Sequence, residues 1–322
     1  MSKVLGINIG GTNCSVSLGE GDESGLVIID KAEFCTSEHP LPEDTLGKLN
    51  ALAYILKDGH KIDAVGISCG GPLNSKTGRI LSPPNLPGWD DIAVCDFFKE
   101  KWDLPVFLQN DANAGAVAEW LYGAGRGAEN FIFITFGTGL GAGLILNGKL
   151  YPGLSDMAGE LGHWRMSPFG PVGYGKSGSF EGFCSGGGIL QLTRERLLEL
   201  RQLGLSHPLM DLDETLTTRD MFELADNGDA LCLEIIDTVG EMFGRGLAIL
   251  IDLLNPEIIV AGSIFTRRYD MLLPIVERVI ESEALPISAK NCRILPSSLG
   301  EKIGDMAALA TALYGIKYLN IN

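Results

Sequence analysis

One short unit occurs twice in this chain of 322 residues, and it limits the possible folds more than any other feature. An apolar run at Val4–Ile9 leads into the turn Gly10-Gly11-Thr12-Asn13, and a second run at Phe131–Phe136 leads into Gly137-Thr138-Gly139. Each turn lies between two runs with β-strand character, the second run of the later pair being Leu144–Leu146. Such a repeat predicts a duplicated subdomain, with a ligand cleft between the two copies.

Strand-like and helix-like runs alternate through the chain, which predicts an α/β sheet protein. The length is typical of two domains. We expect a small α/β domain made of residues 1–111 and 305–322, and a larger α/β domain made of residues 112–304. The expected early elements are strands at Val27–Glu33, Ala64–Cys69 and Val106–Gln109, and helices at Thr45–Lys57 and Ile92–Lys101. A long helix at Ala230–Leu254 should end before Asn255-Pro256, because a residue that precedes proline disfavours the helical region.

The charge and the cysteines exclude several classes of protein. Lys and Arg number 25 against 41 Asp and Glu, a net charge of −16 that repels nucleic-acid phosphates and anionic lipid. The seven cysteines are odd in number and lack a CxxC pair, which argues against a disulfide framework or a metal knuckle and favours a reducing compartment. No signal peptide or membrane span is predicted, because the uncharged stretch 130–148 is broken by glycines. We therefore expect a cytoplasmic protein with no nucleic-acid or membrane partner.

The two glycine turns are candidates for holding phosphates. Glycines let backbone amides approach an anion closely, and Thr12, Asn13 and Thr138 add polar side chains. The alternative for either turn is an ordinary β-hairpin. Neither turn matches the P-loop or the Rossmann fingerprint. Gly262 and Gly304 could pack against a purine, or could simply be a strand-end turn and a helix start.

Polar residues elsewhere could bind a polyol and move a proton. Asp111 follows the strand Val106–Gln109, where ligands collect in α/β sheets, and it could serve as a general base or simply as a helix N-cap. Residues 153–188 lack periodicity, which is typical of a loop that is either functional or disordered. This segment contains Glu160, His163 and Glu181, which together offer acceptors and donors for sugar hydroxyls.

The ordered set of these motifs resembles the ROK family of sugar kinases and repressors. The resemblance runs from residue 4 to about residue 315. The motifs that carry it are Ile9-Gly10-Gly11-Thr12, Gly71-Pro72, Asn85-Leu86-Pro87-Gly88-Trp89, Asn110-Asp111-Ala112-Asn113, Gly123-Ala124-Gly125-Arg126-Gly127, Gly137-Thr138-Gly139, Ala158-Gly159-Glu160-Leu161-Gly162-His163 and Asn255-Pro256-Glu257.

The resemblance implies the actin-like, ribonuclease-H-type fold, with two domains around a cleft. It implies transfer of the γ-phosphoryl group of ATP to a hexose, usually at carbon 6, and often a homodimer. By the same resemblance Asp111 is the catalytic base. The sugar would meet Gly71, Asn85, Asn110, Asp111, Glu160, His163 and Glu181; the nucleotide would meet Gly10, Gly11, Thr12, Asn13, Gly137, Thr138, Gly139, Gly262 and Gly304. A repressor role is not expected, because the chain is acidic and starts at its first strand without a helix-turn-helix.

Two departures from the family pattern bear on metals. Asn8 stands where the family usually has an Asp associated with the Mg²⁺ of Mg-ATP. An amide lacks the charge that this ion favours, so we expect Mg²⁺ to assist phosphoryl transfer less strongly and expect no protein side chain to ligate it. Val172, Tyr174 and Ser179 stand at the cysteine positions of the family's CxCGxxGC zinc pattern. Without thiolates we expect no structural zinc.

The sequence thus predicts an ATP-dependent hexose kinase with a glucose-like substrate. An N-acetylhexosamine kinase stays open, because the sequence does not define the pocket beside carbon 2 of the sugar. A catalytically silent sugar sensor also stays open, with Asn8 as its sign, as does a phosphoryl donor such as polyphosphate. The identity of the hexose is not defined by the sequence.

Overall fold

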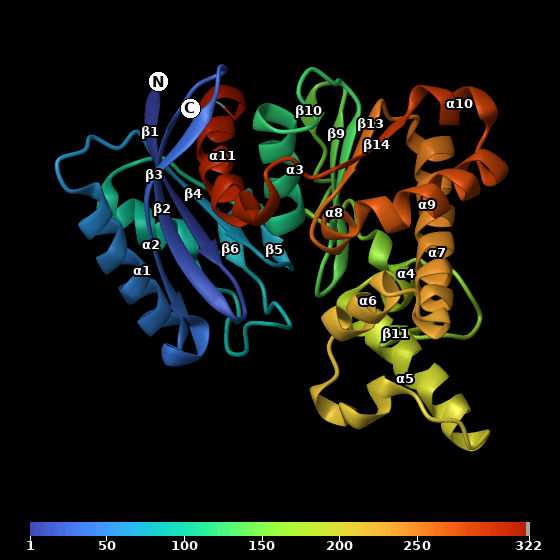
Figure 1. Ribbon diagram of the computed structural model, residues 1–322. Helices are drawn as coiled ribbons and strands as arrows, with labels where there is room; N and C mark the ends of the chain where they lie inside the picture. Colours follow the sequence, from blue (N-terminus) through green and yellow to red (C-terminus); the bar gives the residue numbers. More distant parts are fainter. Residues whose placement is uncertain (320–322) are drawn as a thin grey trace. The chain divides into compact units, whose positions relative to one another are not determined.

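The computed structural model describes residues 1–319 of the chain (Figure 1). Its first sheet holds five strands in the order β3-β2-β1-β4-β7. Its strands are β1 (Ser2–Ile9), β2 (Asn13–Gly21), β3 (Leu26–Cys35), β4 (Ala64–Cys69) and β7 (Val106–Asn110). β1 pairs antiparallel with β2, and β2 pairs antiparallel with β3. β4 lies parallel to both β1 and β7. The expected strand, turn and strand at the start of the chain are confirmed.

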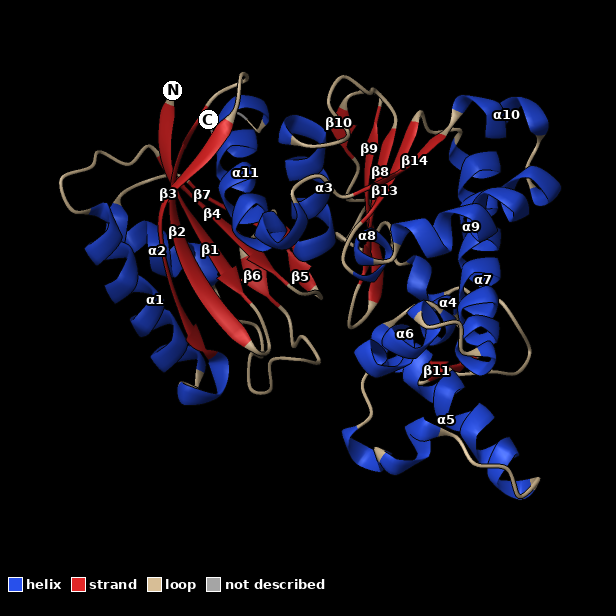
Figure 2. Ribbon diagram, in the orientation of Figure 1, coloured by secondary structure: helices blue, strands red, loops and turns tan. Residues whose placement is uncertain are grey.

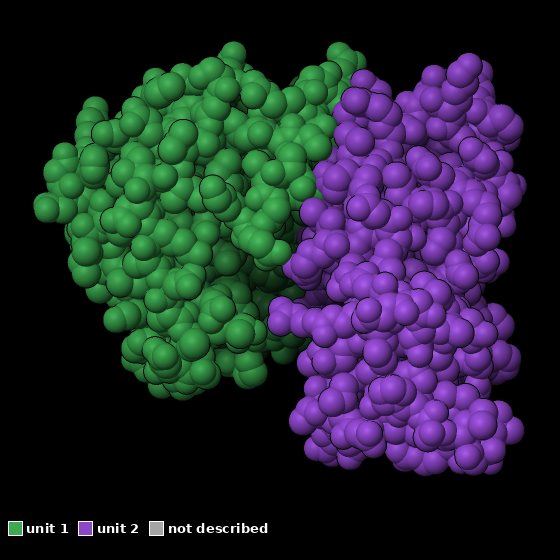
Figure 3. All heavy atoms as spheres, viewed as in Figure 1, with its two compact units in different colours: residues 1–133, 142–159, 297–322 green, residues 134–141, 160–296 purple. Residues whose placement is uncertain are grey.

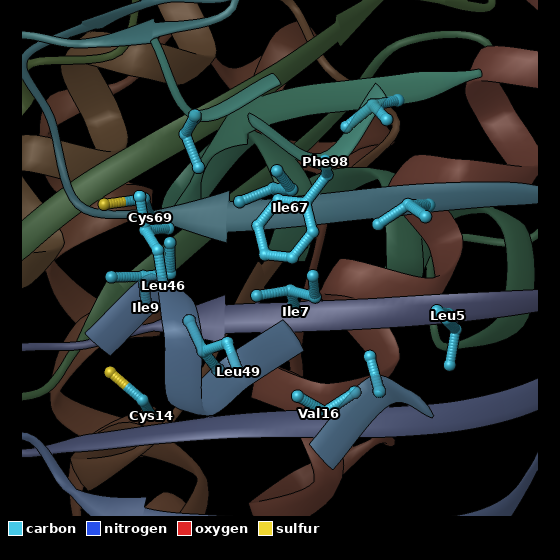
Figure 4. Packing of buried hydrophobic residues seen from close by; sticks show 14 of the residues in the cluster. Leu5, Ile7, Ile9, Cys14, Val16, Leu46, Leu49, Ile67, Cys69 and Phe98 are labelled. Atoms are coloured by element: carbon cyan, nitrogen blue, oxygen red, sulfur yellow. The ribbon is translucent and has the colours of Figure 1, made fainter. Parts of the chain in front are cut away.

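Four helices cover the two faces of this sheet (Figure 2). They are α1 (Pro42–Lys57), α2 (Val94–Trp102), α3 (Asp111–Tyr122) and α11 (Ile303–Tyr318), and a small hairpin is formed by β5 (Leu73–Asn74) and β6 (Arg79–Ile80). Alternation along β1 divides its side chains between the faces. Leu5, Ile7 and Ile9 pack with Leu49 of α1 and Phe98 of α2, as Figure 4 shows.

The opposite face of the sheet packs closely against α11. Val4, Ala64 and Phe107 cluster there with Leu309 and Ala312 of the helix. Glycines in the strands allow this approach. A Cβ atom on Gly66 would lie 2.1 Å from the backbone oxygen of Ala308.

A second five-stranded sheet has the order β10-β9-β8-β13-β14. Its strands are β8 (Phe131–Phe136), β9 (Leu140–Leu146), β10 (Lys149–Leu150), β13 (Ile258–Ala261) and β14 (Arg293–Pro296). The expected α/β class and the second strand, turn and strand are therefore confirmed. The expected start of β9 at Leu144 is wrong, since the strand begins at Leu140 and includes Gly141 and Gly143. Glycine has a low strand propensity, but at position 143 the strand packs closely against α3. A Cβ atom on Gly143 would lie 2.4 Å from the Ala112 oxygen of α3, so only glycine fits there.

The later part of the chain is mostly helical. Its elements are the hairpin of β11 (Val172–Gly173) and β12 (Lys176–Ser177) and the helices α4 (Phe180–Phe183), α5 (Gly186–Gln202), α6 (Thr218–Asp226), α7 (Ala230–Leu254), α8 (Ile264–Arg267), α9 (Tyr269–Glu283) and α10 (Pro286–Asn291). Short 3₁₀ turns lie at Thr36–Glu38, Leu161–His163, Pro208–Asp211, Asp213–Thr215 and Gly300–Lys302. α7 ends as expected, with Asn255 in the left-handed conformation at φ 45°.

The chain forms two compact units (Figure 3). Unit 1 consists of residues 1–133, 142–159 and 297–322, and unit 2 of residues 134–141 and 160–296. The boundary falls within β8 and β9. The expected domains, residues 1–111 plus 305–322 and residues 112–304, stay a prediction. Among residues 1–319, no helix combines the length and the apolar character needed to cross a bilayer.

Gly66→Ala should lower the free energy of unfolding by about 1–3 kcal/mol, because the added methyl group would collide with the backbone of α11. Gly47→Ala in α1 is the matched control, since no neighbouring atom lies within 4 Å of the added group, and it should be neutral or stabilising by up to about 1 kcal/mol. Urea unfolding of both variants measures the difference. Equal losses in the two variants would show that α11 does not depend on this close approach.

Candidate functional site

Three parallel strands of unit 1 end together, and most of the predicted site residues of this unit follow those ends. Ile9 of β1 is in register with Cys69 of β4, which is in register with Asn110 of β7. Gly10, Gly70 and Asp111 come next in the three segments. This is the edge of an α/β sheet at which ligands bind.

At the start of α3, Asn110 and Asp111 have different roles. Asn110 is the N-cap, and its Oδ1 accepts hydrogen bonds from the backbone N–H groups of Ala112, at 2.9 Å, and Asn113. Asp111 Oδ1 also accepts from Ala112 N–H, at 2.8 Å, and its side chain is exposed. Since Asn110 occupies the cap, the capping alternative for Asp111 is not needed to explain the helix start.

The pKa of Asp111 is raised above its ordinary value of 3.8. The main cause is desolvation: the carboxylate is reachable by solvent, but surrounding protein excludes part of the water that would stabilise its charge. The hydrogen bond from Ala112 N–H opposes this shift. A carboxylate with a raised pKa is a better proton acceptor than one with an ordinary pKa.

Gly71 and Asn85 lie beside other predicted site residues of unit 1. A Cβ atom on Gly71 would be 3.1 Å from Asn110 Nδ2, so this segment borders the start of α3. A Cβ atom on Gly11 would be 2.6 Å from the Asn85 backbone oxygen. Asn85 is exposed on a loop whose Leu86 and Trp89 are buried in the core.

The side chain of Asn8 faces the beginning of α11. Asn8 is in register with Ser15, whose Oγ donates a hydrogen bond to Asp305 Oδ1 at 2.8 Å. The second oxygen of Asp305 forms an ion pair with Lys31 Nζ at 2.9 Å. A Cβ atom on Gly304 would lie 3.6 Å from Asn8 Nδ2. Gly304 is thus brought to the same edge of unit 1 as the first glycine turn.

Unit 2 brings the second turn together with Gly262 and Glu181. The Gly137 N–H donates to the Gly139 oxygen at 3.1 Å, and the Gly262 N–H donates to the Ile134 oxygen at 2.9 Å. A Cβ atom on Gly137 would be 3.2 Å from Ser263 Oγ. Glu181 Oε2 accepts from the N–H of Leu140, the residue that follows the turn, at 3.0 Å.

The segment that carries Glu160 and His163 packs against Glu181. A Cβ atom on Gly162 would be 3.3 Å from the Cβ of Glu181. The His163 ring lies at an edge-on angle to Tyr174, with centroids 4.7 Å apart, and its carbonyl accepts from Lys176 Nζ at 2.6 Å. The imidazole and both carboxylates are half-buried. Unit 2 thus gathers acceptors and an imidazole in a form suited to sugar hydroxyls.

Three side chains in unit 2 could suggest a metal site. His207, Asp229 and Cys232 have ligand atoms within 4.8 Å of one another. His207 Nδ1 accepts from Leu209 N–H, so Nε2 carries the hydrogen that it donates to Asp229 at 3.1 Å. Asp229 caps α7 by accepting from Cys232 N–H, and burial, together with the nearby Asp229, raises the pKa of Cys232 to about 12. His207 caps the 3₁₀ turn at Pro208–Asp211 and Asp229 caps α7, and we assign these contacts to helix capping.

Two buried polar residues that hold backbone segments of unit 1 in place were not predicted from the sequence. Glu119 of α3 is fully buried and accepts from the backbone N–H groups of Ala124, at 2.8 Å, and Leu299, at 3.0 Å. Its charge within the apolar helix was a signal that could have been noticed. Thr36, which contacts the first glycine turn, carries no comparable signal.

The comparisons with known proteins agree with this geometry. The ROK family model matches residues 4–314. A glucokinase from Halalkalibacterium halodurans is 35% identical over 93% of this chain and 92% of its own length, and a xylose repressor from Bacillus spizizenii is 28% identical over 92% of this chain and 73% of its own length. The crystal structure of the ROK family glucokinase from Streptomyces griseus, in complex with glucose and AMPPNP, is 28% identical and covers 97% of this chain and 99% of its own, with a TM-score of 0.77.

The match covers both glycine turns, the Asn110-Asp111 segment and the segment from Glu160 to His163. The chain therefore belongs to the ROK family and has its actin-like fold.

Proposed function

We propose that this protein is an ATP-dependent hexose kinase, which transfers the γ-phosphoryl group to a sugar hydroxyl, at carbon 6 of a glucose-like substrate. The observation that carries the proposal is the common edge of unit 1, where a carboxylate with a raised pKa follows β7 and a glycine turn follows β1. A base and a phosphate-binding turn on one sheet edge are the parts that phosphoryl transfer requires. The identity of 35% to a glucokinase makes the sugar-kinase class the best supported one.

Asp111 is the proposed general base. Its carboxylate accepts the proton of the attacking hydroxyl as the bond from oxygen to phosphorus forms and the bond to the ADP oxygen breaks. Asn110, held as the N-cap of α3, keeps Asp111 at the helix start and presents its amide to the sugar together with the Gly71 and Asn85 segments. Glu160, His163 and Glu181 are the proposed sugar ligands of unit 2.

The two glycine turns are proposed to hold the phosphates, through backbone N–H groups and the Thr12, Asn13 and Thr138 side chains. Gly262 and Gly304 are proposed to face the adenosine. Bound Mg²⁺ would neutralise charge on the transferred phosphates. Asn8 offers an amide, and Asp305 is already held by Ser15 and Lys31, so we propose that ATP itself and water supply most of the ligands of this ion.

We propose a cytoplasmic protein without nucleic-acid partners, supported by its charge of −16 and by free cysteines throughout the described residues. We propose that it has no structural zinc. The positions of the family's zinc cysteines hold Val172, Tyr174 and Ser179, and Cys184 is buried with its thiol directed at the Val239 oxygen.

A homodimer should form, and exposed apolar side chains on unit 2 offer it a surface. Ile249 and Leu253 of α7 are 47% and 69% exposed, and Leu285 and Ile287 beside and on α10 are 59% and 75% exposed. The two helices meet where the Leu285 N–H donates a hydrogen bond to Asp252.

Sedimentation equilibrium should give twice the chain mass for the wild-type protein. The double variant Leu253→Glu with Ile287→Glu should give the mass of a single chain, and a monomeric wild-type protein would contradict the proposal.

A coupled assay of ADP release with Mg-ATP should show turnover that depends on a hexose. The panel would contain glucose, its epimers and N-acetylhexosamines, with a blank that lacks sugar. Turnover with an N-acetylhexosamine alone would replace the glucose-like substrate. Absence of turnover with every sugar, while sugar still raises the melting temperature, would establish a silent sensor instead. Polyphosphate in place of ATP tests the donor.

Asp111→Asn should lower kcat by roughly 10²–10⁴, because the amide cannot accept the proton. For the wild-type enzyme, kcat/KM should fall as the pH falls through the raised pKa of Asp111, above its ordinary 3.8, and this acid limb should vanish in the variant. The fold disfavours the charged carboxylate, so Asp111→Asn should not lower the melting temperature at neutral pH.

Asp96→Asn, an exposed carboxylate on α2, is the matched control and should keep the wild-type rate and pH profile. An Asp111→Asn variant with near wild-type turnover would remove Asp111 from the role of base.

A further inference from the structure

The first glycine turn is held to the body of unit 1 chiefly by Thr36, which directly follows β3, with a longer hydrogen bond from Cys14 Sγ to the Gly10 oxygen at 3.7 Å. The Thr36 Oγ1–H donates to the Gly10 backbone oxygen at 2.6 Å, and the Thr36 N–H donates to the Thr12 backbone oxygen at 2.8 Å. Gly10 and Thr12 are two residues apart in the turn, so a single side chain and its own amide hold the turn at two points. Thr36 is buried, whereas Gly11, Thr12 and Asn13 are exposed.

These bonds decide which backbone groups the turn can present. The Asn13 oxygen is also held, because it accepts from the Gly10 N–H at 3.2 Å. The carbonyl oxygens of Gly10, Thr12 and Asn13 are thus all turned to partners within unit 1. Carbonyl oxygens would repel an anion, and a turn that holds them internally can present its N–H groups instead.

The surroundings of Thr36 keep its hydroxyl in place. Asn13 of β2 pairs with Cys35 of β3, which brings Thr36 beside the turn. Cys14 Sγ lies 3.3 Å from Thr36 Oγ1. Burial raises the pKa of this thiol, so it stays protonated beside the hydroxyl.

The second turn is held in a similar way in unit 2, by a backbone N–H group instead of a side-chain hydroxyl. The Gly137 oxygen, which corresponds in position to that of Gly10, accepts from the Gly186 N–H at 2.8 Å. In both units a distant segment fixes the carbonyl of the first glycine of the turn. In unit 1 a side chain makes this bond, and the bond can therefore be removed by substitution.

We propose that Thr36 is the positioning residue of the phosphate-binding turn, and that it fixes the N–H groups of Gly11, Thr12 and Asn13 for the nucleotide. The inference rests on the proposed function of the turn. Thr36 touches neither substrate in this role, because its effect passes through the backbone of Gly10 and Thr12. Its loss should weaken binding of the phosphoryl donor and leave binding of the sugar unchanged.

The test is Thr36→Val, which has nearly the same shape and lacks the hydroxyl. The KM for Mg-ATP should rise roughly threefold to thirtyfold, since the Gly10 oxygen loses its short hydrogen bond from Thr36 and keeps only the 3.7 Å bond from Cys14 Sγ. The dissociation constant of ADP, measured by calorimetry, should rise by a similar factor, while the KM for the sugar stays within about twofold. Thr36→Ser restores the hydroxyl and should restore nucleotide binding. Thr36→Ala is the second variant, for use if the valine does not fold.

Thr45→Val is the matched control. Thr45 is fully buried in the same unit, and its Oγ1–H donates to the His39 oxygen at 2.5 Å and not to an atom of the glycine turn. It should lower stability without altering the KM for Mg-ATP. An unchanged KM for Mg-ATP in Thr36→Val, an equal rise in the KM for sugar, or the same rise in Thr45→Val would overturn the inference.

The calorimetric arm separates this inference from the proposed function. If the wild-type protein shows no turnover with any sugar but binds ADP, the kinase proposal fails, and weaker ADP binding by Thr36→Val would still support the role of Thr36. If turnover is present and ADP binding is unchanged by the substitution, the inference fails alone. If the wild-type protein does not bind ADP, both fail.

Discussion

The register of β1, β4 and β7 is the constraint on which the functional geometry of unit 1 depends. Ile9, Cys69 and Asn110 are partners across the sheet, so the residues after them share one edge although they are spread over about 100 positions of the chain. A slip of one residue would exchange the faces of the sheet and would bury polar side chains such as Asn8 among the apolar residues that face α1 and α2. The buried apolar side chains on that face therefore maintain the position of Asp111 as well as the stability of the unit.

Both glycine turns solve the same problem of holding an exposed loop rigid without bulky side chains. Within each turn the first glycine donates to a carbonyl two or three residues later, and its own carbonyl is held by a distant segment. The internal bond closes the loop, and the distant bond prevents it from rotating as a body. Glycine makes the backbone of such a turn flexible. The hydrogen bonds from Thr36 to the first turn and from Gly186 to the second limit that flexibility.

The sequence predicted the features that depend on local chemistry. The strand ahead of each turn, the polar cluster after β7 and the end of α7 at Asn255 each depend on a few adjacent residues. The start of β9 was missed because Gly143 reads as a breaker, and only the close approach of α3 explains its place in a strand. Thr36 was missed for a related reason: its contacts with the glycine turn are with residues more than twenty positions away, and nothing in the local pattern distinguishes it from other threonines.

The loop that carries His163 is held in place by side-chain contacts at the positions where the resembling family pattern has zinc cysteines. A tetrahedral zinc fixes four points of a loop at once. Here Ser179 Oγ donates to the Gly173 oxygen at 3.2 Å and also accepts from the Gly182 N–H, so it joins the hairpin of β11 and β12 to α4. Tyr174 packs on His163, and Trp164 stacks on the buried Phe180 with ring planes 8° apart. These contacts are individually weak, and they depend on the packing of unit 2 rather than on a metal. The loop should therefore resist chelators and lose its order together with the apolar core around Phe180 and Phe243.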